Sequence, residues 1–169
     1  ERMSPPDGGF TQEMVNLYTK LARGGVGLII TGHSYVHPLG KAEPRMTGIH
    51  NDGLIPALEK LVNAVHKLDT KIVMQINHSG GRRDKDVGEE TPIGPSTIEY
   101  EPLEITCRAM DPEEIEQVID FFAQAARRVK NAGFDGVQIH SVHGYLINQF
   151  LSPLTNKSCL LYTSDAADE

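Results

Sequence analysis

Three short runs rich in valine and isoleucine alternate with longer segments that have the apolar spacing of helices. The runs are "GVGLII" at 25–30, "KIVMQI" at 71–76 and "GVQI" at 136–139. Their length and composition are typical of strands in a parallel sheet. The order helix, strand, helix, strand, helix, strand therefore predicts an α/β fold built from βαβ units.

The three segments that precede these runs carry clear helix signals. The first can be capped by Thr11, and it is ended by Gly24 and Gly25. The third opens with Asp111 as the N-cap and Pro112 at the first helical position. The apolar sides predicted to face the core are Met14, Val15, Tyr18, Leu21 and Ala22 in the first; Leu54, Leu58, Leu61, Val62 and Val65 in the second; and Ile115, Val118, Ile119, Phe122, Ala126 and Val129 in the third.

Polar residues alternate with apolar ones toward the end of the second and third runs. Gln75 and Asn77 alternate with Met74 and Ile76, and Gln138 alternates with Val137 and Ile139 before His140. One face of each strand is therefore apolar, whereas the other becomes polar at the carboxyl end. This pattern predicts a (β/α)8, or TIM, barrel, whose inner face turns polar at its active-site rim. A doubly wound sheet is the alternative, but no GxGxxG or P-loop sequence follows any run.

The connection from Ser79 to Met110 is too long for a simple turn, and it has no sustained period. Connections of this length are uncommon in compact domains unless they cover a site. We expect a lid or capping hairpin, with a plain disordered insertion as the alternative.

Composition narrows the class of partner. The formal net charge is -7, which disfavours a nucleic-acid surface, and no apolar run approaches the length of a membrane span. Cys107 and Cys159 are far apart and lack neighbouring cysteines, so we expect two free thiols in a cytoplasmic protein. A small molecule is the expected partner.

His140 and His143 follow the third run, and Tyr145 comes two residues later. Two imidazole N–H groups could converge on one oxygen and stabilise charge that develops there, while the phenol could supply a proton. A metal-dependent hydrolase or lyase that uses His33, His37 and His78 with this pair is a second possibility, although the strand ends offer amides rather than carboxylates. A barrel that binds a ligand without turnover is a third.

A longer stretch carries a family resemblance. "GVQIHSVHGYLINQFLSPLTN" at 136–156 is similar to the signature of the Old Yellow Enzyme family of FMN-dependent NADH:flavin oxidoreductases, a strand followed by Hxx(H or N)GY and FLSPxxN. The stretches "GGVGLIITGHSYVHPLGK" at 24–41 and "KIVMQINHSGGR" at 71–82 also resemble that family's second and third strands with their loops. The resemblance covers roughly residues 4 to 157 and implies a partial TIM barrel, roughly strands 2 to 4 with their helices.

The resemblance also implies roles for individual residues. Gln75 would bind the pyrimidine edge of the isoalloxazine ring of FMN, and the backbone around Gly32 and His33 would approach the same ring. His140, beside the flavin, and His143 would bind the carbonyl oxygen of an electron-poor alkene, and Tyr145 would donate the proton. The implied activity takes hydride from NAD(P)H and reduces an enone or enoyl substrate; it leaves the physiological substrate and the oligomeric state open.

The resemblance stops near Lys157. The expected domain is the N-terminal part of an FMN-binding barrel over residues 1–157, without its first strand, and we expect this part to be inactive alone. The last twelve residues, "SCLLYTSDAADE" at 158–169, resemble a translated sequencing adapter and are predicted to be a non-native tail.

Overall fold

The computed structural model describes residues 2–101 and 104–157. The predicted tail and Cys159 lie outside the described residues. The helices are α1 (Gln12–Arg23), α2 (Ile55–His66), α3 (Pro112–Asn131) and α4 (Leu146–Leu151), with 3-10 turns at Pro38–Gly40 and Asp52–Leu54. The strands are β1 (Leu28–Ile30), β2 (Ser34–Tyr35), β3 (Lys71–Asn77), β4 (Ile93–Gly94), β5 (Ile98–Tyr100), β6 (Ile105–Ala109) and β7 (Gly136–Ile139). No helix in these ranges is long and apolar enough to cross a membrane.

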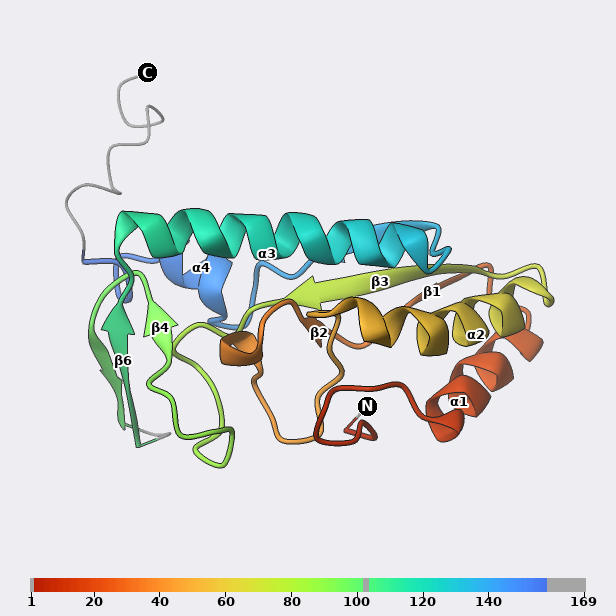
Figure 1. Ribbon diagram of the computed structural model, residues 1–169, viewed down its shortest axis with the longest axis horizontal. Helices are drawn as coiled ribbons and strands as arrows, with labels where there is room; N and C mark the ends of the chain where they lie inside the picture. Colours follow the sequence, from red (N-terminus) through yellow and green to blue (C-terminus); the bar gives the residue numbers. More distant parts are fainter. Residues whose placement is uncertain (1, 102–103, 158–169) are drawn as a thin grey trace, which may run out of the picture.

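The three predicted strands form one parallel sheet, with β3 in the middle (Figure 1). β1 pairs with the first half of β3, and the short strand β2 continues along the same edge by pairing with its end. β7 pairs with the opposite edge, where Gln75 lies beside Gln138. The strands thus follow one another in chain order across the sheet, as they do in a barrel.

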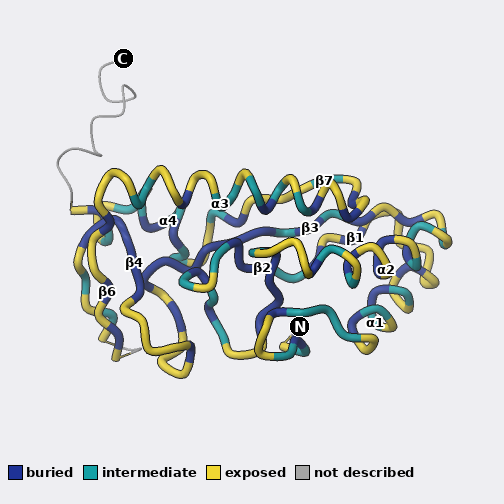
Figure 2. The backbone as a smooth tube through the Cα atoms, viewed as in Figure 1, coloured by how far each residue is buried: buried dark blue, intermediate teal, exposed yellow. Residues whose placement is uncertain are grey.

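Helices α2 and α3 cover one face of this sheet (Figure 1). Figure 2 shows β3 as a buried band between them, and its apolar side chains Ile72, Met74 and Ile76 belong to the main core. The other face is open: Leu28 and Ile30 of β1 are both exposed. The open face carries the polar residues that the alternation predicts, Gln75 and Gln138.

The predicted helix starts are confirmed. The Thr11 hydroxyl accepts the Met14 N–H, and Asp111 and Glu114 form a reciprocal capping box at the start of α3. Two core predictions in the helices are wrong: Leu21 is 48% exposed and Ile119 is 57% exposed. Both residues sit at the margin of an apolar stripe, and Ile119 lines an open apolar pocket together with Ile139 of β7.

Two strand residues are also more exposed than predicted. Val137 and Ile139 of β7 were expected to pack under a helix, but Ile139 is 55% exposed and Val137 is also exposed. The reason is the position of β7, which pairs only with β3 within the described residues and forms the edge of the sheet. Its outer edge therefore has no neighbouring strand among the described residues to cover it.

The long connection folds into a second, smaller sheet in the order β4, β6, β5. β5 and β6 form an antiparallel hairpin, as the capping-hairpin interpretation predicts, and the disordered alternative is wrong. Cys107 on β6 is a free, buried thiol whose Sγ contacts the Ser96 carbonyl oxygen at 3.3 Å. The hairpin lies at one end of the molecule, next to α4 and beyond the carboxyl end of β3 (Figure 1).

Candidate active site

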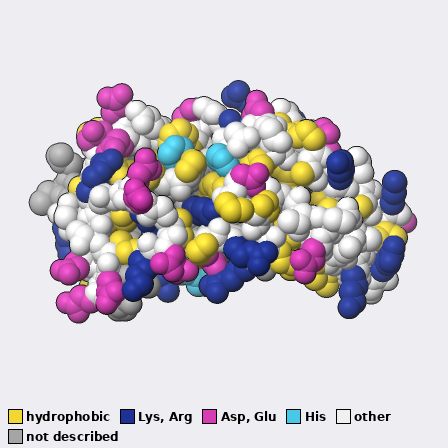
Figure 3. All heavy atoms as spheres, turned by 60° about the horizontal axis from the view of Figure 1, so that its bottom comes forward, with side chains coloured by type: hydrophobic (Ala, Val, Ile, Leu, Met, Phe, Trp, Pro, Cys, Tyr) yellow, Lys and Arg dark blue, Asp and Glu magenta, His cyan; other side chains and the backbone are white. Residues whose placement is uncertain are grey.

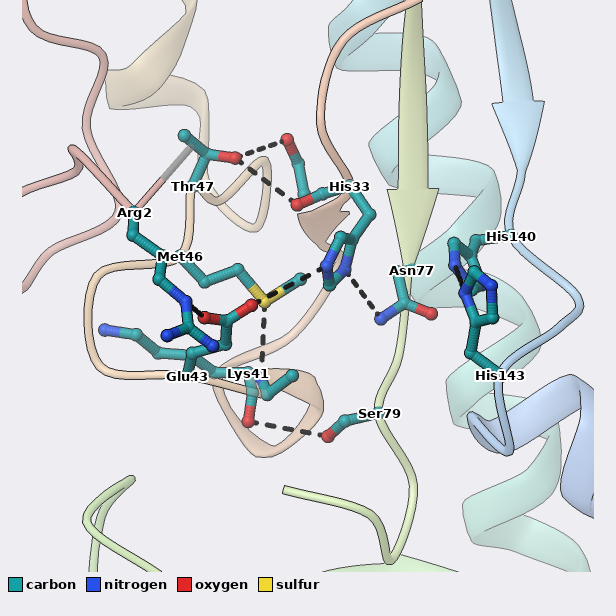
Figure 4. Close-up of polar contacts among 12 residues, drawn as sticks. Arg2, His33, Lys41, Glu43, Met46, Thr47, Asn77, Ser79, His140 and His143 are labelled. Atoms are coloured by element: carbon teal, nitrogen blue, oxygen red, sulfur yellow. Dashed lines mark hydrogen bonds and ion pairs between the residues drawn. The ribbon is translucent and has the colours of Figure 1, made fainter. Parts of the chain in front are cut away.

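The carboxyl ends of β1, β3 and β7 bring three polar segments together. His33 follows β1, Asn77 ends β3, and His140 follows β7. Figure 4 shows Asn77 between His33 on one side and the His140–His143 pair on the other. The Asn77 amide nitrogen lies 3.2 Å from His33 Nδ1, and the Asn77 side chain is fully buried.

Four aromatic rings form the centre of the site. The His33 ring lies 5.4 Å from the centroids of both His140 and Tyr145, and the His140 and Tyr145 centroids are 5.1 Å apart. His143 completes the cluster, with its ring centroid 5.1 Å from that of His140. The fold therefore brings together four of the residues singled out in the sequence.

His143 Nδ1 lies 3.2 Å from His140 Nε2, so that one ring donates to the other. The binding of one substrate oxygen by both histidines stays a prediction. The buried His140 Nδ1 and Asn77 Oδ1 have no hydrogen-bond partner.

The turn that presents Tyr145 has an unusual backbone. His143 has a φ of 61° and Gly144 a φ of 73°, two left-handed residues in succession. The Gly144 N–H donates to Asn148 Oδ1 at 2.9 Å, and Arg82 donates to the His143 carbonyl oxygen. The Arg82 guanidinium also lies 5.9 Å from the centroid of the Tyr145 ring, so one side chain from the loop after β3 contacts both residues.

Gln149 of α4 ties the loops after β3 and β7 together. Its side chain is fully buried, and its Nε2 donates to the carbonyl oxygens of Ser79 at 2.9 Å and Gly144 at 2.7 Å. Its Oε1 accepts the Gly81 N–H at 3.1 Å. Gly80 has a φ of 62°, and a Cβ at this position would lie 2.2 Å from Gln149 Oε1. The close approach therefore requires glycine.

Burial sets the protonation state of the cluster. It is the main cause that lowers the pKa of His33 to about 4, and the nearby His140 adds to the effect. Burial, followed by His143, also lowers the pKa of His140. Burial raises the pKa of Tyr145, and the carboxylate of Glu43 contributes. At neutral pH these two imidazoles are neutral and the phenol is protonated.

Gln75 and Gln138 form a polar patch on the open face, one pleat below Asn77 and His140. The Gln75 amide donates to the Gln138 side-chain oxygen, and the Gln75 N–H donates to Thr31 Oγ1 at 3.2 Å. The Gly32 N–H donates to the Tyr18 hydroxyl oxygen at 3.1 Å. An isoalloxazine ring presents alternating carbonyl and N–H groups along its pyrimidine edge, and side-chain amides can match both. The patch and the unpartnered atoms of Asn77 and His140 therefore fit such a ring.

Two histidines considered as metal ligands lie elsewhere. His37 stacks on Phe121 with 4.2 Å between ring centroids, and His78 is buried against Gly40. No three His, Cys, Asp or Glu residues in the described part of the chain are grouped so as to hold a metal ion.

Three further residues contact the cluster without a role predicted from the sequence: Arg82, Glu43 and Gln149. Glu43 lies 3.9 Å from His33 Nε2 and forms an ion pair with Arg2. Arg82 occurs in the "SGGRR" stretch directly after β3, a position from which a loop residue can reach the site. Gln149 has no such signal, because a buried amide on a short helix looks like an ordinary surface residue in sequence.

Comparison with known proteins places this site in a family. Residues 2–165 match the NADH:flavin oxidoreductase / NADH oxidase family. This match includes the first part of the segment 158–169, whose non-native origin stays a prediction. The NADH oxidase of Thermoanaerobacter brockii is 39% identical over 153 residues, which are 89% of this chain and 24% of that protein.

Solved structures share the fold. The Old Yellow Enzyme from Pichia sp. AKU4542 has a TM-score of 0.87 and 29% identity, covering 97% of this chain and 46% of that one. Morphinone reductase in complex with tetrahydroNAD has a TM-score of 0.86 and 28% identity, covering 97% of this chain and 49% of that one. The chain thus spans less than half the length of these proteins, and its α/β fold is part of a TIM barrel. It belongs to the NADH:flavin oxidoreductase / NADH oxidase family, the FMN-dependent flavoprotein oxidoreductases that include Old Yellow Enzyme.

Proposed function

We propose that this chain forms the substrate-binding and proton-donating part of an NAD(P)H-dependent ene-reductase, a cytoplasmic enzyme that reduces electron-poor alkenes. The observation that carries the proposal is the cluster of His140, His143 and Tyr145 at the carboxyl end of β7. Imidazole N–H groups are hydrogen-bond donors that suit a carbonyl oxygen, and a protonated phenol next to them is an acid.

Gln75, Asn77 and the backbone at Gly32 and His33 would hold FMN against the open face of the sheet. When bound, FMN supplies the hydride chemistry that NAD(P)H drives in this family. Asn77 would contribute the amide oxygen that has no partner in the structure. These residues would bind and orient FMN, and none of them has to change its protonation state.

His140 and His143 would exchange their mutual hydrogen bond for bonds to the substrate's carbonyl oxygen. Their N–H groups stabilise the negative charge that grows on this oxygen as the alkene carbon is reduced. Tyr145 would then donate its hydroxyl proton to the neighbouring carbon. Because the pKa of Tyr145 is raised, the phenol stays protonated until the acceptor carbon is basic enough to take the proton.

The test uses the full-length protein that carries these residues, with its two half-reactions followed by stopped-flow absorbance. Tyr145→Phe should leave FMN bound and its bleaching by NAD(P)H intact, while the return of absorbance on adding an enone slows. His140→Ala removes a donor and should slow alkene reduction on the order of 10²-fold.

Tyr100→Phe is the matched control, since it removes a phenolic hydroxyl from the hairpin rather than from the cluster. It should leave both half-reactions unchanged. The proposal fails if Tyr145→Phe slows the two half-reactions equally, or if His140→Ala slows neither. A ligand-binding barrel without turnover would bind an enone and yet oxidise no NAD(P)H.

A further inference from the structure

A large cavity lies beside the candidate active site. It has a volume of about 750 Å³, and its walls come from the N-terminal segment, from Pro38–Arg45 and from the loop that follows β3. Much of its lining is apolar, with Pro5, Pro6, Pro38, Pro44 and Val87 among the wall residues. Figure 3 shows Lys and Arg side chains mixed with Asp, Glu and apolar side chains on the face turned forward in that view.

Arg83 lines this cavity and is only 7% exposed. It donates to the Glu90 carbonyl oxygen, and its Nε has no partner. None of the ion pairs among the described residues includes Arg83. Burial lowers the pKa of Arg83, against the opposing charge of Glu90. A guanidinium that is buried without a carboxylate partner is costly, and a bound anion would offset that cost.

The other two cations of the cavity wall are also bound to backbone rather than to carboxylates. Lys41 Nζ donates to the Pro6 carbonyl oxygen at 2.9 Å, and Arg45 Nε lies 3.5 Å from the Ser4 carbonyl oxygen. Three carboxylates share the wall, those of Asp86, Glu89 and Glu90. All three of these residues are exposed, so water screens their charge far more than it screens that of Arg83.

Arg83 also connects this cavity to the catalytic cluster. It lines a smaller cavity of about 200 Å³ whose wall includes Arg82 and the predicted proton donor Tyr145. Because the two cavities share Arg83, we expect a molecule that reacts next to Tyr145 to reach the larger apolar space past this side chain. The apolar residues of the wall would contact an apolar chain of this molecule, and Arg83 would bind a negatively charged group on it.

We propose that the alkene substrate carries an anionic group, a carboxylate or a phosphate, on an apolar arm, and that Arg83 binds this group. Planar guanidinium groups bind both kinds of anion through paired hydrogen bonds. The inference rests on the proposed ene-reductase function and adds the substrate class to it. It makes Arg83 a specificity-determining residue, distinct from the groups that contact the reacting carbons.

The test compares enones that carry the same flexible arm ending in a carboxylate, a phosphate monoester or an uncharged carboxamide. The full-length enzyme should have a kcat/KM for the anionic enones about 10- to 100-fold above that for the carboxamide, as expected for one charged hydrogen-bond pair. Arg83→Gln should remove most of this preference. The preference of the unmodified enzyme should also fall as ionic strength rises.

Lys85→Gln is the control, because it removes a positive charge from the same loop at an exposed residue outside the cavity wall. It should leave the preference intact. If Arg83→Gln does not fold, Arg83→Lys decides: it keeps the positive charge but loses the planar guanidinium, so the preference should weaken, and an unchanged preference overturns the inference. An enzyme that reduces all three enones equally well also overturns it, while the proposed function stands. An enzyme that reduces none refutes the proposed function itself.

Discussion

Replacing Gln149 by leucine tests whether one buried amide holds the active-site loops together. The substitution keeps the side-chain size but removes three hydrogen bonds, to Ser79, Gly81 and Gly144. Each is worth about 1 kcal/mol, and the Ser79 carbonyl and Gly81 N–H left behind are buried without this partner, so the expected loss in the free energy of unfolding is about 3 to 5 kcal/mol.

Equilibrium unfolding of the full-length protein in urea, with far-UV circular dichroism as the signal, measures this loss. Gln117→Leu is the matched control, because Gln117 lies exposed on α3 and makes one weak contact with Glu113. It should change the unfolding free energy by less than about 0.5 kcal/mol. If Gln149→Leu costs no more than this control, the loops are held by other contacts and the reasoning is wrong.

Three further predictions concern acid stability, helix capping and the cofactor. Burial lowers the pKa of His78 to about 3, so between this value and about pH 6.5 the unfolded chain binds one more proton than the folded chain. The free energy of unfolding should therefore fall by about 1.4 kcal/mol per pH unit as the pH drops through this range. Urea titrations at several pH values should show that His78→Gln flattens this slope. Asp111→Ala removes the side chain that accepts the Glu114 N–H at 2.8 Å and should cost about 1 kcal/mol in the same assay, whereas an unchanged midpoint would show that the cap contributes nothing. The 169-residue chain by itself should lose FMN on desalting, because the face of the sheet that would hold the ring is open to solvent, as the exposed side chains of Leu28 and Ile30 show. A stoichiometric yellow complex would contradict this prediction.

The regular elements could be predicted because each has a local cause. Thr11 and Asp111 mark helix starts through hydrogen bonds to their own chain neighbours. β2 was missed because a strand of two residues, Ser34 and Tyr35, has no period to detect, and it exists through long-range pairing with β3 and with the segment around Gly48. The exposure of Ile119 was missed for a similar reason, since the edge of an apolar stripe is defined by what packs against it.

The candidate site was predictable where residues follow a strand directly. His33, His140 and Tyr145 lie in segments that begin within a few residues of a strand end, and the parallel sheet brings those ends together. The hydrogen bond between the two histidines could not be foreseen, because it depends on the left-handed turn at His143. Arg82 could have been noticed from its place directly after β3, but the contacts of Gln149 are long-range and no local pattern in the sequence indicates them.

The central position of β3 has a consequence for how the chain acquires its structure during synthesis. Its contacts with the β1 side span 44 residues, as between Thr31 and Gln75, whereas those with β7 span 63, as between Gln75 and Gln138. At ribosomal rates β3 can pair with β1 early, while its other edge waits about 3 to 12 s for β7 to be made. During that interval the nascent chain presents an apolar strand edge with free N–H and C=O groups. This edge is where we expect a chaperone to bind, and where association between incomplete chains would begin.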